Sequence, residues 1–298
     1  MHPHADAGKS ASIRSSAMSR SCILSLCLVL LARISAFAQG APSPDTVNYG
    51  SGSLTLRGVV YRPPGGGRHP AVLYLHGSGE EYDKQAAAIG ALYASHGYVL
   101  FFPYRRGQGL SAGRGEAILQ RLGREVAEHG PEVRAPLLAR LLETEQLDDV
   151  PAALGYLHER ADVDSSRMVV AGNSFGGILT VFAAAWAPGV KAAIASAPAA
   201  QSWASAPDLR ARMIAAVRAS AVPVFFFQAQ NDYDLSPSRE LPAAMDSAGR
   251  SHTVRVYPGF GTTVQDGHAF GYFGGSIYGP DVFAFLAASL GPARIPPK

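Results

Sequence analysis

Cysteine is scarce in this sequence. The 298 residues contain two, Cys22 and Cys27, and both lie in an N-terminal segment with the features of a cleaved signal peptide. The rest of the chain is therefore expected to have no disulfide, no thiolate metal site and no cysteine nucleophile.

The chain also has little net charge. It contains 26 basic and 23 acidic residues, and residues 1–38 account for the whole excess, with four basic residues and one acidic. The segment 39–298 is formally neutral, so no nucleic-acid partner is expected. We find no cluster with metal-ligand spacing and no phosphate-binding loop, and we therefore expect no metal and no cofactor.

The apolar segment Cys22–Leu31 is too short to span a membrane as a helix. It follows a basic start and precedes the small-residue site that ends at Ala38, a combination typical of secretory signal peptides. We expect cleavage between Ala38 and Gln39, secretion or periplasmic export, and no stable membrane insertion afterwards. An uncleaved anchor is the alternative. Because residues 1–17 are polar, unlike a normal leader, Met18 is an alternative start.

Apolar runs alternate with helical stretches along 39–298, a length that suits one large α/β domain. Nearly continuous apolar strands indicate a mostly parallel sheet covered by helices on both faces. We expect strands at 54–61 (an outer strand), 71–75, 98–102, 168–171, 192–195, 222–227 and 253–257. We expect helices at 84–96, 146–160, 176–186, 208–219, 238–248 and 280–290.

The most informative motif is Gly-Asn-Ser-Phe-Gly, centred on Ser174. It follows the expected strand at 168–171 and precedes an expected helix. A serine hydroxyl is nucleophilic only when a tight strand-to-helix turn exposes it, and the flanking glycines permit such a turn. Ser174 is therefore the candidate nucleophile, and a plain glycine-rich turn is the alternative.

Ligands bind at the carboxyl ends of the strands in sheets of this type. Five expected strands are followed there by residues capable of chemistry, in loops that contain His76–Gly79, Tyr104–Gly109, Ser174, Asn231–Asp234 and His268. Packing alone does not explain five such coincidences.

With these motifs in this order, the chain resembles the α/β-hydrolase superfamily. The segment Arg105–Ser111, Arg-Arg-Gly-Gln-Gly-Leu-Ser, and the segment Asp266–Phe270, Asp-Gly-His-Ala-Phe, are similar to the dienelactone-hydrolase-related branch. The resemblance covers residues 50–290 and implies an α/β-hydrolase fold. Dienelactone hydrolases proper use a cysteine where this chain has Ser174, which puts dienelactone in doubt as the substrate.

The resemblance implies a catalytic triad in the order serine, acid, histidine. Of the two histidines beyond Ser174, His252 opens a strand, whereas His268 lies in the loop after it, where a general base belongs. Asp232 is the preferred acid, and Asp234 is the alternative; the other aspartate is then a turn or capping residue.

Oxyanion binding requires two N–H donors, expected from Phe175 and from Ser78, with Gly79 as the alternative to Ser78. His76 more often holds its loop than acts as a second base. Tyr104, Arg105 and Arg106 are candidates to contact the substrate, and the two arginines are candidates for binding a carboxylate; the alternative is that the arginines brace their loop.

Residues 113–144 exceed a minimal fold. Their apolar residues recur at helical spacing, which predicts two amphipathic helices that either cap the pocket or pack outside it.

We interpret the chain as a secreted serine hydrolase that cleaves an ester, thioester or lactone of a small-molecule acyl substrate through an acyl-enzyme. The alternatives are a serine peptidase of the prolyl-oligopeptidase-like type and a non-catalytic binding protein on the same fold. The oligomeric state is left open.

Overall fold

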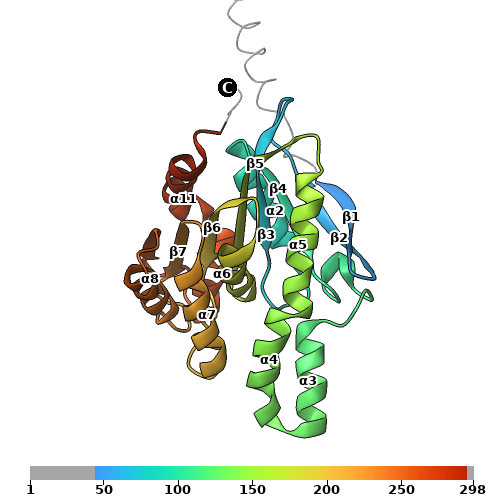
Figure 1. Ribbon diagram of the computed structural model, residues 1–298, viewed down its shortest axis with the longest axis vertical. Helices are drawn as coiled ribbons and strands as arrows, with labels where there is room; N and C mark the ends of the chain where they lie inside the picture. The colour runs from blue at the N-terminus through green and yellow to red at the C-terminus, as the bar shows by residue number, and fades with distance from the viewer. Residues whose placement is uncertain (1–43, 294–298) are drawn as a thin grey trace, which may run out of the picture. The chain divides into compact units, whose positions relative to one another are not determined.

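An eight-stranded sheet lies at the centre of the fold in this computed structural model, which describes residues 44–293 (Figure 1). The expected leader and signal peptide, 1–38, lie outside the described residues. The strand order is β1-β2-β4-β3-β5-β6-β7-β8. The strands are β1 (Asp45–Ser51), β2 (Leu54–Tyr61), β3 (His69–Leu75), β4 (Val99–Tyr104), β5 (Val163–Asn173), β6 (Val190–Ser196), β7 (Val224–Ala229) and β8 (His252–Tyr257).

The sheet is antiparallel at one edge and parallel elsewhere. β1 pairs antiparallel with β2, β2 pairs antiparallel with β4, and every pair from β4 to β8 is parallel. The mostly parallel sheet predicted from the sequence is thus confirmed. The prediction that 54–61 is the outer strand was wrong, because β1 lies outside it. β1 is half exposed and mixed in polarity, which explains why its apolar signal is weak.

Helices cover both faces of the sheet, as predicted. On one face, a hydrophobic cluster packs the sheet against four helices: α5 (Glu145–His158), α6 (Phe175–Trp186), α7 (Pro207–Ala219) and α8 (Pro237–Ser247). On the other face, a second hydrophobic cluster packs the sheet against α2 (Asp83–Ser95), α10 (Phe270–Phe273) and α11 (Gly275–Leu290). Among the described residues, no helix is long and apolar enough to cross a membrane.

The central strands are buried on both faces. Leu73 and Val170 point into the first cluster, while their chain neighbours Val72 and Val169 point into the second. Full burial of such a side chain contributes about 1.5–3 kcal/mol relative to exposure. The sheet is therefore a rigid base for the loops at its carboxyl edge.

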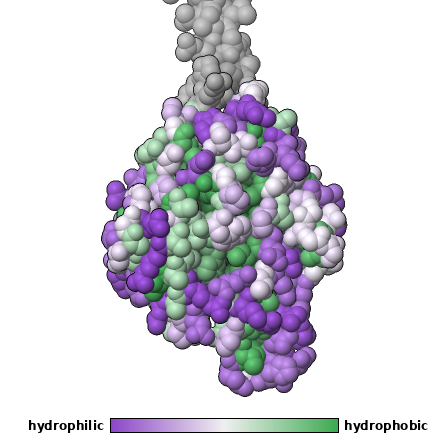
Figure 2. All heavy atoms as spheres, in the orientation of Figure 1, coloured by the Kyte–Doolittle hydropathy of each residue, from purple (hydrophilic) through white to green (hydrophobic). Residues whose placement is uncertain are grey.

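The segment 113–144 forms two helices, α3 (Ile118–His129) and α4 (Arg134–Glu143), joined through a short 3₁₀ turn, Pro131–Val133. Both helices of this insert lie beyond the end of α5 in Figure 1. Figure 2 shows mainly hydrophilic residues on the surface of this insert, at the bottom of the view, with hydrophobic residues between them. The two predicted amphipathic helices are present. Apolar residues of both line the pocket described below, among them Leu122 of α3 and Leu138 of α4, while Leu137 and Leu141 of α4 pack into the hydrophobic core.

Candidate active site

Ser174 occupies a tight turn between β5 and α6. Its backbone has φ 59° and ψ −118°, in the left-handed half of the map that non-glycine residues rarely adopt. A Cβ at Gly176 would overlap the carbonyl oxygen of Leu75, and a Cβ at Gly172 would crowd the backbone of Gly176. The glycines of the motif thus allow β3, β5 and α6 to approach closely enough for this turn to form.

Ser174, His268 and Asp232 form one hydrogen-bonded chain. His268 Nε2 lies 2.8 Å from Ser174 Oγ, and His268 Nδ1 lies 2.8 Å from Asp232 Oδ1. His268 ends α9 (Val264–His268), which follows β8, and Asp232 follows β7. Three separate loops at the carboxyl edge of the sheet therefore bring these side chains together. His252, in contrast, is the first residue of β8 and lies away from them.

Asp232 is held with its carboxylate aimed at His268. Its side chain is fully buried, the amide of Tyr233 donates to Oδ1 at 2.7 Å, and Gln228 Nε2 donates to Oδ2 at 2.9 Å. Asp234 does something else: its Oδ1 accepts a 2.8 Å hydrogen bond from the amide of Ser236, just before α8. The geometry therefore favours Asp232 as the partner of His268 and gives Asp234 the turn role.

A second set of contacts fixes His268. Asn231 Nδ2 donates to the carbonyls of Phe260 and Thr263 at 2.9 Å each, which ties the loop after β7 to the loop before α9. Thr263 and Asp266 form a capping box at the start of α9. These polar contacts orient the short helix that carries the imidazole.

The loop His76–Gly79 lies beside Ser174. The amide of Gly77 donates to the Tyr272 hydroxyl at 2.8 Å, and the amide of Gly79 donates to the Tyr82 hydroxyl at 2.7 Å. Burial raises the pKa of both tyrosines, so both hydroxyls stay protonated at neutral pH. Since Gly79 is already engaged, this geometry favours the Ser78 amide over that of Gly79 as a donor to substrate.

His76 holds this loop rather than acting as a second base. Its Nδ1 donates to the carbonyl of Gly77 at 2.9 Å, and its Nε2 accepts from the amide of Arg105 at 3.2 Å. Burial, with a smaller effect of the Arg105 charge, holds the pKa of His76 well below its usual value. The ring is therefore neutral, with its proton on Nδ1.

Arg105 is a brace, and its proposed contact with substrate is corrected. Its guanidinium is buried and donates to the carbonyls of His76 and Gly77 at 2.6 Å each. It also lies 4.8 Å from the centre of the Phe175 ring. These contacts use the Nη1 and Nη2 donors with which a guanidinium would bind a carboxylate.

Arg106 and Tyr104 are corrected in the same way. Arg106 forms a 2.7 Å ion pair with Asp149, and the Tyr104 hydroxyl donates to Asp83 at 2.7 Å. Neither side chain lines a cavity beside Ser174. The sequence alone does not show that carboxylates distant in the chain pair with these groups, Asp149 with Arg106 and Asp83 with Tyr104.

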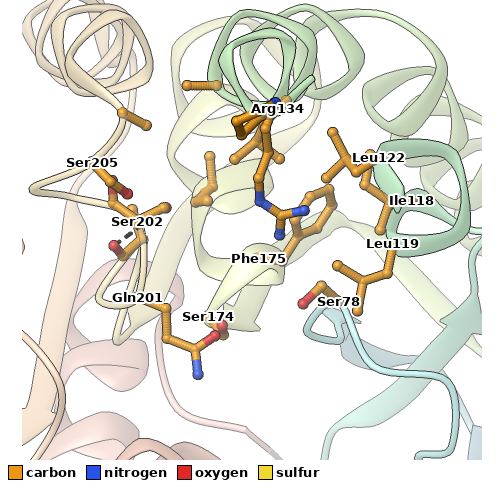
Figure 3. A pocket seen from close by; sticks show the side chains of 16 residues that line it. Ser78, Ile118, Leu119, Leu122, Arg134, Ser174, Phe175, Gln201, Ser202 and Ser205 are labelled. Carbon is orange, nitrogen blue, oxygen red and sulfur yellow. Dashed lines mark hydrogen bonds between the residues drawn. The ribbon is translucent and has the colours of Figure 1, made fainter. Parts of the chain in front are cut away.

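A pocket of about 310 Å³ opens beside Ser174, and the insert helices form one wall of it (Figure 3). Sequence reasoning missed Arg134 and the segment after β6 that line it. One signal for Arg134 was available, because it lies four residues before Leu138 and seven before Leu141, on the apolar side of its helix. The lining residues are Ser78, Ile118, Leu119, Leu122, Pro131, Arg134, Ala135, Leu138, Ser174, Phe175, Ile178, Ala199, Gln201, Ser202, Ser205 and Ala206.

Comparison with known proteins agrees with this geometry. A profile of the dienelactone hydrolase family matches residues 56–272, which include every residue of the hydrogen-bonded chain. The chain belongs to the dienelactone hydrolase family. No curated protein matches it in sequence at a significant level.

Solved structures show how widely this family fold is shared. Pyrococcus horikoshii acylaminoacyl peptidase is similar with a TM-score of 0.63 and 16% identity over 87% of this chain, which spans 44% of the peptidase. Thermogutta terrifontis esterase 2 is similar with a TM-score of 0.59 and 18% identity, over 87% of this chain and 99% of the esterase. At these identities the likeness establishes the α/β-hydrolase fold and leaves the substrate to other arguments.

Proposed function

We propose that this member of the dienelactone hydrolase family is a serine hydrolase that cleaves a carboxylic ester or a related acyl bond, such as a thioester or lactone. The observation that carries the proposal is the chain from Asp232 through His268 to Ser174, with both links at 2.8 Å. The nucleophile and the orienting acid are thus each within hydrogen-bond reach of the base.

In the first half-reaction, Ser174 Oγ bonds to the acyl carbon and its proton passes to His268 Nε2. Asp232 keeps the other ring proton on Nδ1 and stabilises the imidazolium that forms. The carbonyl oxygen becomes an oxyanion, and the amides of Phe175 and Ser78 are the proposed donors to it. His268 then gives its proton to the leaving oxygen as the bond from the acyl carbon to that oxygen breaks.

In the second half-reaction, water attacks the acyl-enzyme. His268 accepts a proton from the water, whose oxygen bonds to the acyl carbon. Collapse of the second oxyanion breaks the bond to Ser174 Oγ, and the proton on His268 returns to that oxygen. The acid product leaves and the resting state is restored.

A fluorophosphonate probe tests the nucleophile. We expect the wild-type protein to be labelled and Ser174→Ala, at a half-buried side chain that lines the pocket, to fold normally and lose both the label and turnover of p-nitrophenyl butyrate. Removing a triad nucleophile lowers the rate by orders of magnitude. Labelling that persists in this variant would contradict the proposal.

The similarity to acylaminoacyl peptidase keeps a peptidase as the second candidate. Peptide anilides assayed beside short-chain esters separate the two activities. Turnover of neither, together with binding of an acyl compound, would indicate a non-catalytic binding protein.

We further propose export after cleavage before Gln39, because the sequence combines a short apolar core with a small-residue site. N-terminal sequencing of exported protein should begin at Gln39. Material that retains Cys22 or Cys27 would contradict this.

A further inference from the structure

Two cavities meet at Ser174, and they differ in chemistry. We call the cavity beneath α3 and α4 the insert pocket, and the other, of about 250 Å³, the histidine cleft. Both are lined by Ser78, Ser174 and Gln201, but His268 lines only the histidine cleft. A substrate bonded to Ser174 can therefore extend one part into each.

The position of His268 indicates which part of the substrate enters which cavity. The leaving group must receive its proton from His268 Nε2, so it must lie on the histidine side of Ser174. The acyl group is then directed into the insert pocket. This step rests on the proposed function, since it assumes that Ser174 is acylated.

The insert pocket is apolar on one side and polar on another. Ile118, Leu119 and Leu122 of α3 lie on one side, and the hydroxyls of Ser202 and Ser205 lie opposite (Figure 3). The Arg134 side chain extends from α4 between them toward Phe175. The pocket thus offers methylene-binding surface next to hydrogen-bond donors.

Arg134 is the one charged residue among the residues that line the insert pocket, and none of them is acidic. Within residues 44–293, its guanidinium has no hydrogen bond or ion pair. Two other arginines of the insert behave differently, because Arg121 and Arg124 both pair with Glu116. A guanidinium without a partner at a pocket that has one apolar wall suits an anion that arrives with the ligand, and its planar donors match a carboxylate.

We propose that the insert pocket takes an acyl group that ends in a carboxylate, so that the preferred substrates are half-esters of dicarboxylic acids. The methylenes pack against α3 and the distal carboxylate pairs with Arg134, near Ser202 and Ser205. Because Arg134 is exposed at the mouth of the pocket, this pair is screened by solvent, and its effect on selectivity is expected to be moderate.

The test compares two esters of equal acyl length, mono-p-nitrophenyl adipate and p-nitrophenyl hexanoate, with rates taken above those of Ser174→Ala. Wild type should prefer the adipate. Arg134→Gln should lower kcat/KM for the adipate by roughly fivefold and change that for the hexanoate by less than about twofold. Arg140→Gln, an exposed position on the same helix that does not line the pocket, is the matched control.

Arg134→Lys, which keeps the charge, should retain part of the preference, and added salt should weaken it. A second measurement needs no turnover. It compares how well the free acids, adipate and hexanoate, protect Ser174 from labelling by fluorophosphonate. The inference would be overturned if Arg134→Gln changed kcat/KM equally for the adipate and hexanoate esters, or if the wild type showed no preference between these esters. Hydrolysis that persists in Ser174→Ala would instead overturn the proposed function.

Discussion

The most discriminating prediction concerns the two neighbouring aspartates. Asp232→Asn should lower kcat by about 10⁴, whereas Asp234→Asn should leave it nearly unchanged. A factor of 10⁴ corresponds to about 5.4 kcal/mol of lost transition-state stabilisation. The contrast is large because only one of the two carboxylates touches His268.

The contacts of Asp232 explain the size of the effect. Gln228 Nε2 donates to Oδ2 and is itself fixed by donating to the carbonyl of Asp234 at 3.0 Å, so an asparagine NH₂ at Oδ2 would face another donor. The opposite orientation turns the NH₂ toward His268 and the Tyr233 amide, and it favours the tautomer that cannot accept the Ser174 proton. In both orientations, the negative charge that stabilises the imidazolium is lost.

Asp234→Asn keeps an oxygen for the amide of Ser236, so it should cost about 1 kcal/mol of stability or less. The assay is kcat for both variants with p-nitrophenyl butyrate at one pH, with circular dichroism to show that each is folded. A larger loss of kcat in the Asp234 variant than in the Asp232 variant would refute the reasoning.

Three further predictions concern the frame around Ser174. Arg105→Lys should lower both Tm and kcat, because lysine lacks the two guanidinium nitrogens that each donate to one carbonyl, and a buried acceptor left without a partner costs about 1–3 kcal/mol. Gly176→Ala should destabilise by about 1–3 kcal/mol or more in urea unfolding, because its methyl group overlaps the Leu75 carbonyl; Gly123→Ala, with open space around it, is the control. Below pH 6.5 the unfolded chain protonates His76 and the folded chain does not, so stability should fall toward pH 5 by up to about 1.4 kcal/mol per pH unit, and His76→Gln should flatten that slope.

The sheet, its helices and the central residues of the site could be predicted because each leaves a local pattern. Buried parallel strands are continuous in apolar residues, and Ser174 lies in a short motif between a strand and a helix. His268 follows from chain order and from its place after a strand. These patterns can be recognised without knowing which side chains contact one another in the fold, so a single sequence is enough to predict them.

The direction of polar side chains could not be predicted. Arg105 and Arg134 are both arginines near the carboxyl edge of the sheet, yet one is buried against backbone carbonyls and the other lines the pocket. The difference depends on which partner lies across the fold. A guanidinium is directed by acceptors distant in sequence, and the sequence pattern around each arginine does not contain them.

The hydrogen-bonded chain and the insert pocket are built by different parts of the fold. Ser174, His268 and Asp232 are held by the sheet edge and by loop contacts such as that of Asn231, while one wall of the insert pocket comes from α3 and α4. Under the proposed function, a substitution in the insert should therefore change the preference for acyl groups without moving the hydrogen-bonded chain. For this reason, a change of preference between adipate and hexanoate esters, at constant fluorophosphonate labelling, is the effect that distinguishes a role of the insert in specificity from a role in folding.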